Sequence, residues 1–216
     1  MVELLGSLSC ATVDYRVFVV PPDEWWTVTG IHVANSNVSS RTYNLRHRKP
    51  TEATSSKQYL VATKTIAGSS DELRSGLLGF GPLDEMTASA SFGTSVAINV
   101  YGYKTKVPRI VHLGQKLLTT TEDRIFGVPA GERWVVTAIN ACNSVAAGRT
   151  YQLRHKRAGV ALTTADYLVG NKSLAANADE IRTGMPSFGP LDELVCKGNS
   201  TAVAVNAYGY KLKVAA

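Results

Sequence analysis

The chain has 216 residues, of which 44% are hydrophobic and 19% are charged, a balance typical of globular proteins. No apolar run approaches the roughly 18–20 residues of a membrane helix, so we expect no membrane partner. The net charge is +6, but residues 1–108 hold ten Lys/Arg and nine Asp/Glu, whereas residues 109–216 hold thirteen and eight. A charge excess in one half argues against a nucleic-acid-binding fold, which would carry a basic stripe in the fold itself.

The first ten residues, "MVELLGSLSC", contain Glu3 and no basic residue, so we expect no signal peptide. The three cysteines, Cys10, Cys142 and Cys196, are odd in number and have no paired spacing. We therefore expect reduced thiols and neither a disulfide framework nor a metal site, in a protein assembled in a cytosol.

Strand signals dominate the first half of the chain. Runs rich in Val, Ile, Thr, Tyr and Trp alternate with Gly, Pro, Asn, Asp and Ser, and no segment keeps a helical period over three turns. The predicted strands are 16–20, 25–35, 41–48, 58–66, 71–78, 85–91 and 95–104. The strand "WWTVTGIHVAN" (25–35) is apolar on both faces, so it is central or is covered by another part of the protein.

The second half repeats the first at a spacing of 108 residues. "RTYNLRH" (41–47) returns as "RTYQLRH" (149–155), and "FGPLDE" (80–85) returns unchanged at 188–193. The corresponding strands are predicted at 124–128, 133–143, 149–157, 166–174, 179–185, 193–198 and 202–212. A period this long is too large for a solenoid unit, so each copy should be a domain, 1–108 and 109–216.

Seven or eight short strands in about a hundred residues indicate an antiparallel β-sandwich, and a jelly-roll variant is equally compatible. We therefore predict an all-β protein of two tandem homologous antiparallel β-sandwich (jelly-roll-like) domains.

Alternation along the last strand of each copy separates two faces. Val96, Ile98 and Val100 share one face, which we assign to the core, and Tyr101 and Tyr103 share the other. The tyrosines either cap the edge of the core or form a contact surface. The equivalent residues in the second copy are Tyr208 and Tyr210.

The repeated phrase at 41–47 has the same alternation, with Tyr43 and Leu45 inward and Arg46 and Arg48 outward. His47 then lies at a strand end, where we expect a hydrogen bond to a turn. The outward basic residues face either solvent or a neighbouring subunit, and we favour an interface for at least one of Arg46 and its counterpart. Together with the tyrosines, the candidate interface residues are Arg46, Arg48, Tyr101, Tyr103, Arg154, Lys156, Tyr208 and Tyr210.

The sequence gives no sign of catalysis. Adjacent carboxylates such as Asp84-Glu85 point to opposite faces of a strand and do not converge. Asp71 and Arg74, with Asp179 and Arg182 in the second copy, are expected to form local ion pairs. Serine-hydrolase, P-loop, HExxH and CxxC patterns do not occur. We predict no catalytic residue, no metal and no cofactor.

Several segments of the second half together resemble a small domain of tailed-bacteriophage virion proteins. They are "FGVPAGERWVVTAINACNS" (126–144), "RTYQLRH" (149–155), "ADYLVGNKSLAANADEIRTG" (165–184) and "AVAVNAYGYKL" (202–212). The first half departs from this pattern, with "VPPDEWW" (20–26) and "IAGSSDEL" (66–73) at the corresponding places. The motifs are turn and strand patterns, so they specify a fold more closely than a role.

The resemblance implies a non-enzymatic structural protein of a tailed-phage virion, in the tail, baseplate or neck or on the capsid surface, assembled in the host cytoplasm. Its partners would be other virion proteins and copies of itself, as a trimer or hexamer. Three duplicated chains would present six near-equivalent domains to a sixfold ring. The alternative is a module that binds glycans or a host receptor through its loops or tyrosine face.

Overall fold

The computed structural model describes residues 1–214, which form seventeen strands and two short 3-10 helices. The first half contains β1 (Glu3–Ser9), β2 (Tyr15–Val19), β3 (Trp25–Asn35), β4 (Arg41–Arg48), η1 (Ser56–Gln58), β5 (Tyr59–Ile66), β6 (Ser70–Phe80), β7 (Glu85–Ala90) and β8 (Val96–Thr105). The second half contains β9 (Val111–Leu117), β10 (Asp123–Gly127), β11 (Glu132–Asn143), β12 (Arg149–Lys156), η2 (Thr164–Asp166), β13 (Tyr167–Leu174), β14 (Asp179–Thr183), β15 (Ser187–Phe188), β16 (Glu193–Gly198) and β17 (Val203–Lys213).

The strands of the first half pair as one long hairpin rolled into two sheets. β1 pairs with β8, β2 with β7, β3 with β6 and β4 with β5, all antiparallel. The sheet orders are β1-β8-β3-β6 and β2-β7-β4-β5. Consecutive strands therefore enter opposite sheets except β4 and β5, which pair at the end of the hairpin, and this is the topology of a jelly roll.

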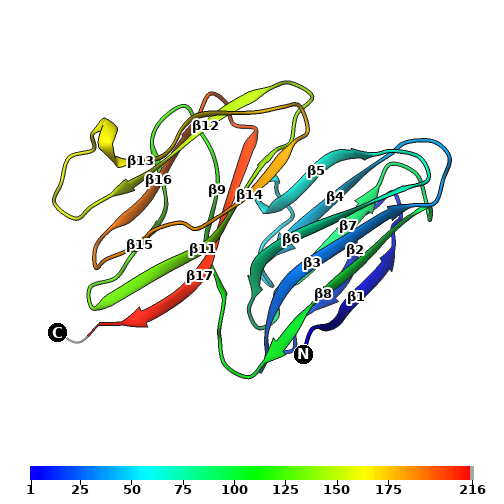
Figure 1. Cartoon of the computed structure of the whole chain (residues 1–216), viewed down its shortest axis with the longest axis horizontal. Coiled ribbons are helices and arrows are strands. Elements are labelled where there is room, and N and C mark those ends of the chain that lie inside the picture. The colour runs from blue at the N-terminus through cyan, green and yellow to red at the C-terminus, as the bar shows by residue number, and fades with distance from the viewer. Residues whose placement is uncertain (215–216) are drawn as a thin grey trace.

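The second half has the same pairing, with β9 on β17, β10 on β16, β11 on β14 and β12 on β13. β15 adds a further short pairing to β11. Every sheet draws its strands from one half of the chain, and Figure 1 shows the two groups of strands side by side. The predicted antiparallel all-β class is confirmed.

Each half has its own hydrophobic core between its two sheets. Val96, Ile98 and Val100 are fully buried in the first core, as the alternation predicts. The second core contains Val203, Val205 and Ala207 at the corresponding positions. Two residues of the second half, Ile110 and Tyr208, pack into the core of the first half.

The first strand of each half, β1 and β9, escaped prediction because polar residues and glycine interrupt its apolar pattern. The glycine is required at this position. A Cβ on Gly6 would lie 2.6 Å from the carbonyl oxygen of Val17, and a Cβ on Gly114 would lie 2.5 Å from that of Ile125. Glycine lets the first strand approach the second closely, at the cost of a weaker strand signal.

Side-chain contacts also recur at a spacing of 108 residues. The indole nitrogen of Trp26 donates to Glu24 at 2.6 Å, and that of Trp134 donates to Glu132 at 2.7 Å. In each half the carboxylate at the strand entry satisfies the polar atom of an otherwise buried tryptophan.

Within residues 1–214, no helix has the length and apolar character to cross a membrane, and no group of three or more His, Cys, Asp or Glu could hold a metal ion. The three cysteines are free and buried. Burial raises the pKa of Cys10 and of Cys196 to about 12, so both thiols stay protonated at neutral pH.

Candidate assembly interface

The two halves meet along a continuous surface, here called the junction. The first half contributes η1, β5 and β6, and the second half contributes one face of the sheet formed by β9, β17, β11 and β14. Figure 1 shows β5 and β6 beside β14 and β11. The junction is therefore heterologous, because an edge of one half sits on a sheet face of the other.

Two asparagines of the second half cap the edge strand β5. The side-chain nitrogen of Asn140 donates to the carbonyl oxygen of Leu60 at 3.1 Å, and that of Asn206 donates to the carbonyl oxygen of Tyr59 at 3.1 Å. Both asparagines are almost fully buried. They satisfy backbone groups that an edge strand would otherwise leave open to solvent or to another strand.

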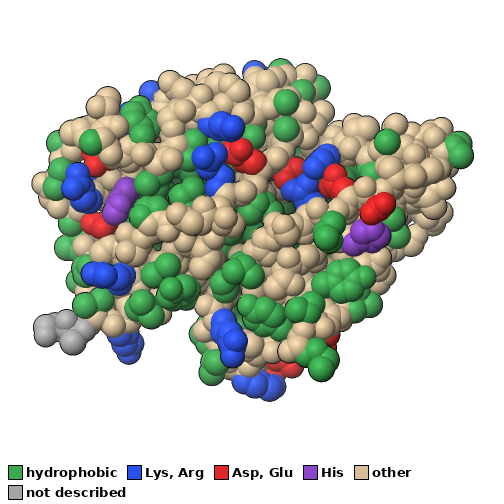
Figure 2. All heavy atoms as spheres, viewed as in Figure 1, with side chains coloured by type: hydrophobic (Ala, Val, Ile, Leu, Met, Phe, Trp, Pro, Cys, Tyr) green, Lys and Arg blue, Asp and Glu red, His purple; other side chains and the backbone are tan. Residues whose placement is uncertain are grey.

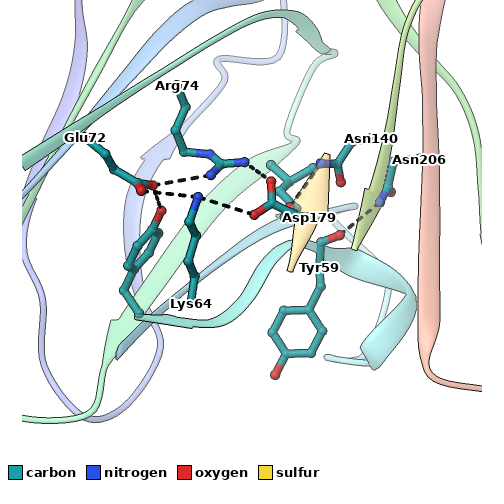
Figure 3. Close-up of polar contacts among 9 residues, drawn as sticks. Tyr59, Lys64, Glu72, Arg74, Asn140, Asp179 and Asn206 are labelled. Atoms are coloured by element: carbon teal, nitrogen blue, oxygen red, sulfur yellow. Dashed lines mark hydrogen bonds and ion pairs between the residues drawn. The ribbon is translucent and has the colours of Figure 1, made fainter. Parts of the chain in front are cut away.

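A charged cluster closes one side of the junction (Figure 3). Arg74 bonds to Asp179 of the second half, whose side chain is 1% exposed, and Lys64 lies 3.9 Å from the same carboxylate. Glu72 approaches Arg74 at 3.3 Å and Lys64 at 3.2 Å. These side chains line an open groove of about 270 Å³ and hold β5 and β6 to β14.

The expected pairing of Asp71 with Arg74 is wrong. Arg74 pairs with Glu72 instead, and Arg182 pairs with Glu180 at 3.1 Å. Residues two apart on a strand share a face, whereas residues three apart point to opposite faces. The same rule leaves Asp179 free to reach across the junction.

A histidine cluster forms the other side of the junction. Nε2 of His47 donates to Asp84 at 2.9 Å, and the hydroxyl of Tyr208 donates to Nδ1 of His47 at 3.0 Å. Lys49 donates to the same oxygen of Asp84 at 2.8 Å. The ring of His112 lies 4.9 Å from that of His47 between centroids. His47 thus bonds to the turn before β7, as its place at a strand end predicts.

Burial sets the protonation of this cluster. It lowers the pKa of His47, and the hydrogen bond to Asp84 offsets only part of the shift. Burial and then the neighbouring His47 hold the pKa of His112 well below its ordinary value. Burial acts to raise the pKa of Asp84, but the bonds from His47 and Lys49 outweigh it and bring the pKa to about 2. Both histidines are therefore neutral at pH 7, facing an ionised Asp84.

The junction should weaken in mild acid. In the unfolded chain His47 and His112 would take up protons near pH 6.5, whereas the folded chain resists until a lower pH. Each histidine therefore removes up to about 1.4 kcal/mol of stability per pH unit as the pH falls below about 6.5. We expect His112→Leu to flatten this dependence, measured by chemical denaturation at pH 7.5, 6.5 and 5.5. The first half carries Leu4 at the equivalent position.

The control is His32→Asn, which changes a partly exposed histidine to the residue that the second half has at position 140. The pH dependence of stability should flatten more in His112→Leu than in His32→Asn. An unchanged slope in His112→Leu would show that the ring of His112 does not govern the response.

The candidate tyrosines occupy unlike environments. Tyr208 is fully buried in the junction, whereas its counterpart Tyr101 is 37% exposed. Tyr103 is half-buried, and Tyr210 is 37% exposed. One of the four thus already serves a contact surface, within the chain.

The candidate basic residues bond within their own halves rather than forming a free outward stripe. Arg46 pairs with Asp14 and stacks over Tyr59, with 13% of its side chain exposed. Arg154 pairs with Glu122 at 2.7 Å, and its guanidinium carbon lies 4.1 Å from the centre of the Tyr167 ring. Arg48 pairs with Glu85 and Lys156 with Glu193, each at 2.8 Å. Their exposed portions remain available to a neighbour, and an interface role for them remains a prediction.

The junction residues that sequence reasoning missed are Lys64, His112, Asn140, Asp179 and Asn206. Lys64, His112 and Asp179 are polar or charged residues that strand alternation alone assigns to solvent, whereas Asn140 lies on a largely apolar strand. Asn206 carries no distinguishing signal, because Asn99 stands at the same place in the first half and is not covered.

No protein-family model matches the chain, and no curated protein matches it. Among solved structures, the chain is similar to the major capsid protein P2 from bacteriophage PM2, with 12% identity, a TM-score of 0.43 and coverage of 99% of this chain and 98% of that one. It is also similar to the STIV MCP, with 9% identity, a TM-score of 0.32 and coverage of 98% of this chain and 96% of that one. A chain of Broad Bean Stain Virus has 7% identity and a TM-score of 0.34, with coverage of 99% of this chain and 88% of that one. Similarities at this level assign no function.

Proposed function

We propose that the chain is a structural, non-enzymatic protein of a virus particle, built from two jelly-roll domains, 1–108 and 109–216, that arose by tandem duplication. Its task is to bind copies of itself and other virion proteins. The observation that carries the proposal is the junction, in which an edge of one jelly roll sits on the sheet face of a second one. A unit that docks edge to face can be repeated to build a shell or a ring.

The repeated contacts support duplication. Asp84 accepts a bond from the backbone nitrogen of Gly81 at 2.8 Å, and Asp192 accepts one from Gly189 at 2.8 Å. Conserving such turn geometry over two copies within one chain is what duplication of a folded unit would produce. The resemblance of residues 124–212 to tailed-phage virion domains supports a tail, baseplate, neck or capsid-surface location, with assembly in the host cytoplasm.

Three chains would supply six jelly rolls of near-equivalent shape, which suits a trimer on a sixfold or quasi-sixfold position. The test is mass spectrometry of purified particles separated into heads and tails, with the copy number from the peptide intensities. We expect the chain in one fraction at a multiple of three copies per symmetry position. Absence from purified particles would refute the virion role.

A glycan- or receptor-binding role is the second candidate. A shallow hollow of about 490 Å³ on the outer face of β3 and β6 is lined in part by His32 and Asp71, and Tyr101 is exposed on the neighbouring strand of the same sheet. Aromatic and polar groups together can hold a sugar. Tyr208 is buried, so the equivalent position of the second half is not open to a sugar. Saturable glycan-array binding that is lost in Tyr101→Ala would favour this role.

A further inference from the structure

The outer face of the β1-β8-β3-β6 sheet is the counterpart of the face that the junction covers. We propose that this open face binds the second half of another copy of the chain, seated as the first half is seated on the second within one chain. The inference rests on the self-assembly proposed above and names its surfaces. The open face comprises Leu4, His32, Asp71, Leu73, Asn99 and Tyr101, and the docking edge comprises His155, Tyr167, Leu168, Lys172 and Arg182.

The same sheet positions are covered in one half and bare in the other. Tyr208 is 0% exposed, and its counterpart Tyr101 is 37% exposed. Ile181 lies against Gly76 across the junction, with 3.2 Å from its side chain to a Cβ placed there, whereas its counterpart Leu73 is 71% exposed. Leu4, at the position of the half-buried His112, is 51% exposed.

The open face therefore groups large apolar side chains that a covered sheet would bury. Figure 2 shows hydrophobic side chains gathered over β3 and β8 in the right half of the view. Together, Leu4, Leu73 and Tyr101 form an apolar patch, and such patches on a folded surface commonly mark an interaction site. The chain itself shows what fits this sheet face, because an edge of the same fold covers the equivalent one.

The second half offers an edge with matching chemistry. Arg182 stands where Arg74 stands in the first half, and 33% of its side chain is exposed. Seated in the same way, it would reach Asp71, whose side chain is 66% exposed and which stands where Asp179 stands. Lys172 is exposed at the position of Lys64. The basic excess of the second half and an exposed carboxylate on the open face are thus complementary.

The polar contacts of the junction can also be repeated. The hydroxyl of Tyr101 would donate to Nδ1 of His155, whose Nε2 already bonds to Asp192 at 2.7 Å. The side-chain oxygen of Asn99 accepts from Ser7 at 2.7 Å, so its nitrogen is oriented by that bond and would donate to the carbonyl oxygen of Tyr167.

At the rim of the junction, near η1, the residues of the proposed contact differ from those of the junction on both surfaces. In the junction Gln115 donates to Glu52 at 2.8 Å. The counterparts are Ser7 and Val160, of which Val160 is 45% exposed, while Leu4 replaces a histidine nearby. Two polar positions of the junction, Glu52 and His112, thus become Val160 and Leu4 in the proposed contact, and burying these apolar side chains favours association in water.

Repeating the junction in this way joins chains head to tail, and such a contact closes into a ring or grows into a filament. With six jelly rolls in a closed ring, three chains complete it. Within the chain Cys142 lies against the backbone of Ala62 in the junction. The counterparts across the proposed contact are Ala34 on the open face and Gly170 on the docking edge.

The test is the double variant Ala34→Cys, Gly170→Cys, oxidised and run on a non-reducing gel. The native cysteines are buried and should not contribute. We expect a covalent trimer as the main product, with each single variant lacking this ladder. A ladder extending well beyond three chains would overturn ring closure, and the absence of any cross-linked species would overturn the docking itself.

A charge reversal gives an independent reading that does not depend on disulfide geometry. Asp71→Arg should weaken self-association at least tenfold in sedimentation equilibrium, and adding Arg182→Asp should restore a large part of it. Asp23→Arg, which changes a carboxylate 69% exposed at a loop away from this face, is the control. Equal association of Asp71→Arg and Asp23→Arg, with both folded by circular dichroism, would refute the contact.

The two proposals fail separately. Self-association through this face by a chain that is absent from particles would leave the docking intact and remove the virion role. A chain found in particles whose association ignores the Asp71 and Arg182 exchanges would keep the virion role and remove this interface.

Discussion

Asp84→Asn should destabilise the protein by about 3–5 kcal/mol, the cost of removing one partner from a buried ion pair. The carboxylate accepts from His47, Lys49 and the backbone of Gly81 while the residue is 1% exposed. The asparagine amide carries no negative charge, and its NH2 group is itself a donor that would face the donors of His47, Lys49 or Gly81. The loss should appear as a drop of roughly 10 °C in Tm by calorimetry, since each kcal/mol shifts a domain of this size by about 2–4 °C.

Asp192→Asn is the matched control, because it changes the same position of the second half. Asp192 bonds to His155 and to the backbone of Gly189, but its side chain is 13% exposed and lies outside the junction. Water can compensate part of the lost charge there, so the cost should be about 1–2 kcal/mol. Equal losses at the two positions would show that the junction does not isolate Asp84 from solvent.

Tyr208→Ala should cost about 3–5 kcal/mol, because removing a large buried aromatic side chain leaves a cavity. The ring is fully buried, belongs to the core of the first half and holds His47 by its hydroxyl. The two halves should therefore lose cooperativity, so that denaturation followed by tryptophan fluorescence and by circular dichroism no longer gives coincident curves. Tyr208→Phe, which removes only the hydroxyl, should cost about 1–3 kcal/mol.

Tyr101→Ala is the comparison, at the same sheet position of the first half. The side chain is 37% exposed, so the free energy of unfolding should change by less than about 0.5 kcal/mol at protein concentrations where the chain is monomeric. A large loss in this variant would mean that the open face is already packed within the chain. A small loss in Tyr208→Ala would mean that the junction contributes little to stability.

The repeat and most strands could be predicted because both leave strong signals in the sequence. A two-residue alternation identifies a strand such as 41–48 wherever one face is buried. The 108-residue spacing then identifies the equivalent strand of the second half, 149–156. The first strand of each half was missed because the glycine that close packing requires weakens the same alternation.

The candidate site was less predictable, since its residues are defined by a contact between distant segments. Asn140 and Asn206 meet carbonyl oxygens 80 and 147 residues away, and nothing local to either residue indicates this. The ion pair of Asp179 is likewise set by the packing of β14 against β6 and not by the neighbouring arginine in sequence.

By itself, therefore, the sequence determined that the chain is an all-β protein with two similar halves, because strand alternation and repetition are local properties. Only the tertiary structure decided which sheet face is covered. Tyr101 and Tyr208 each begin the same tripeptide, "YGY", yet Tyr101 is exposed and Tyr208 is fully buried. Two halves joined head to tail in one chain can cover one such face and leave the other open, so their identical residues meet different surroundings.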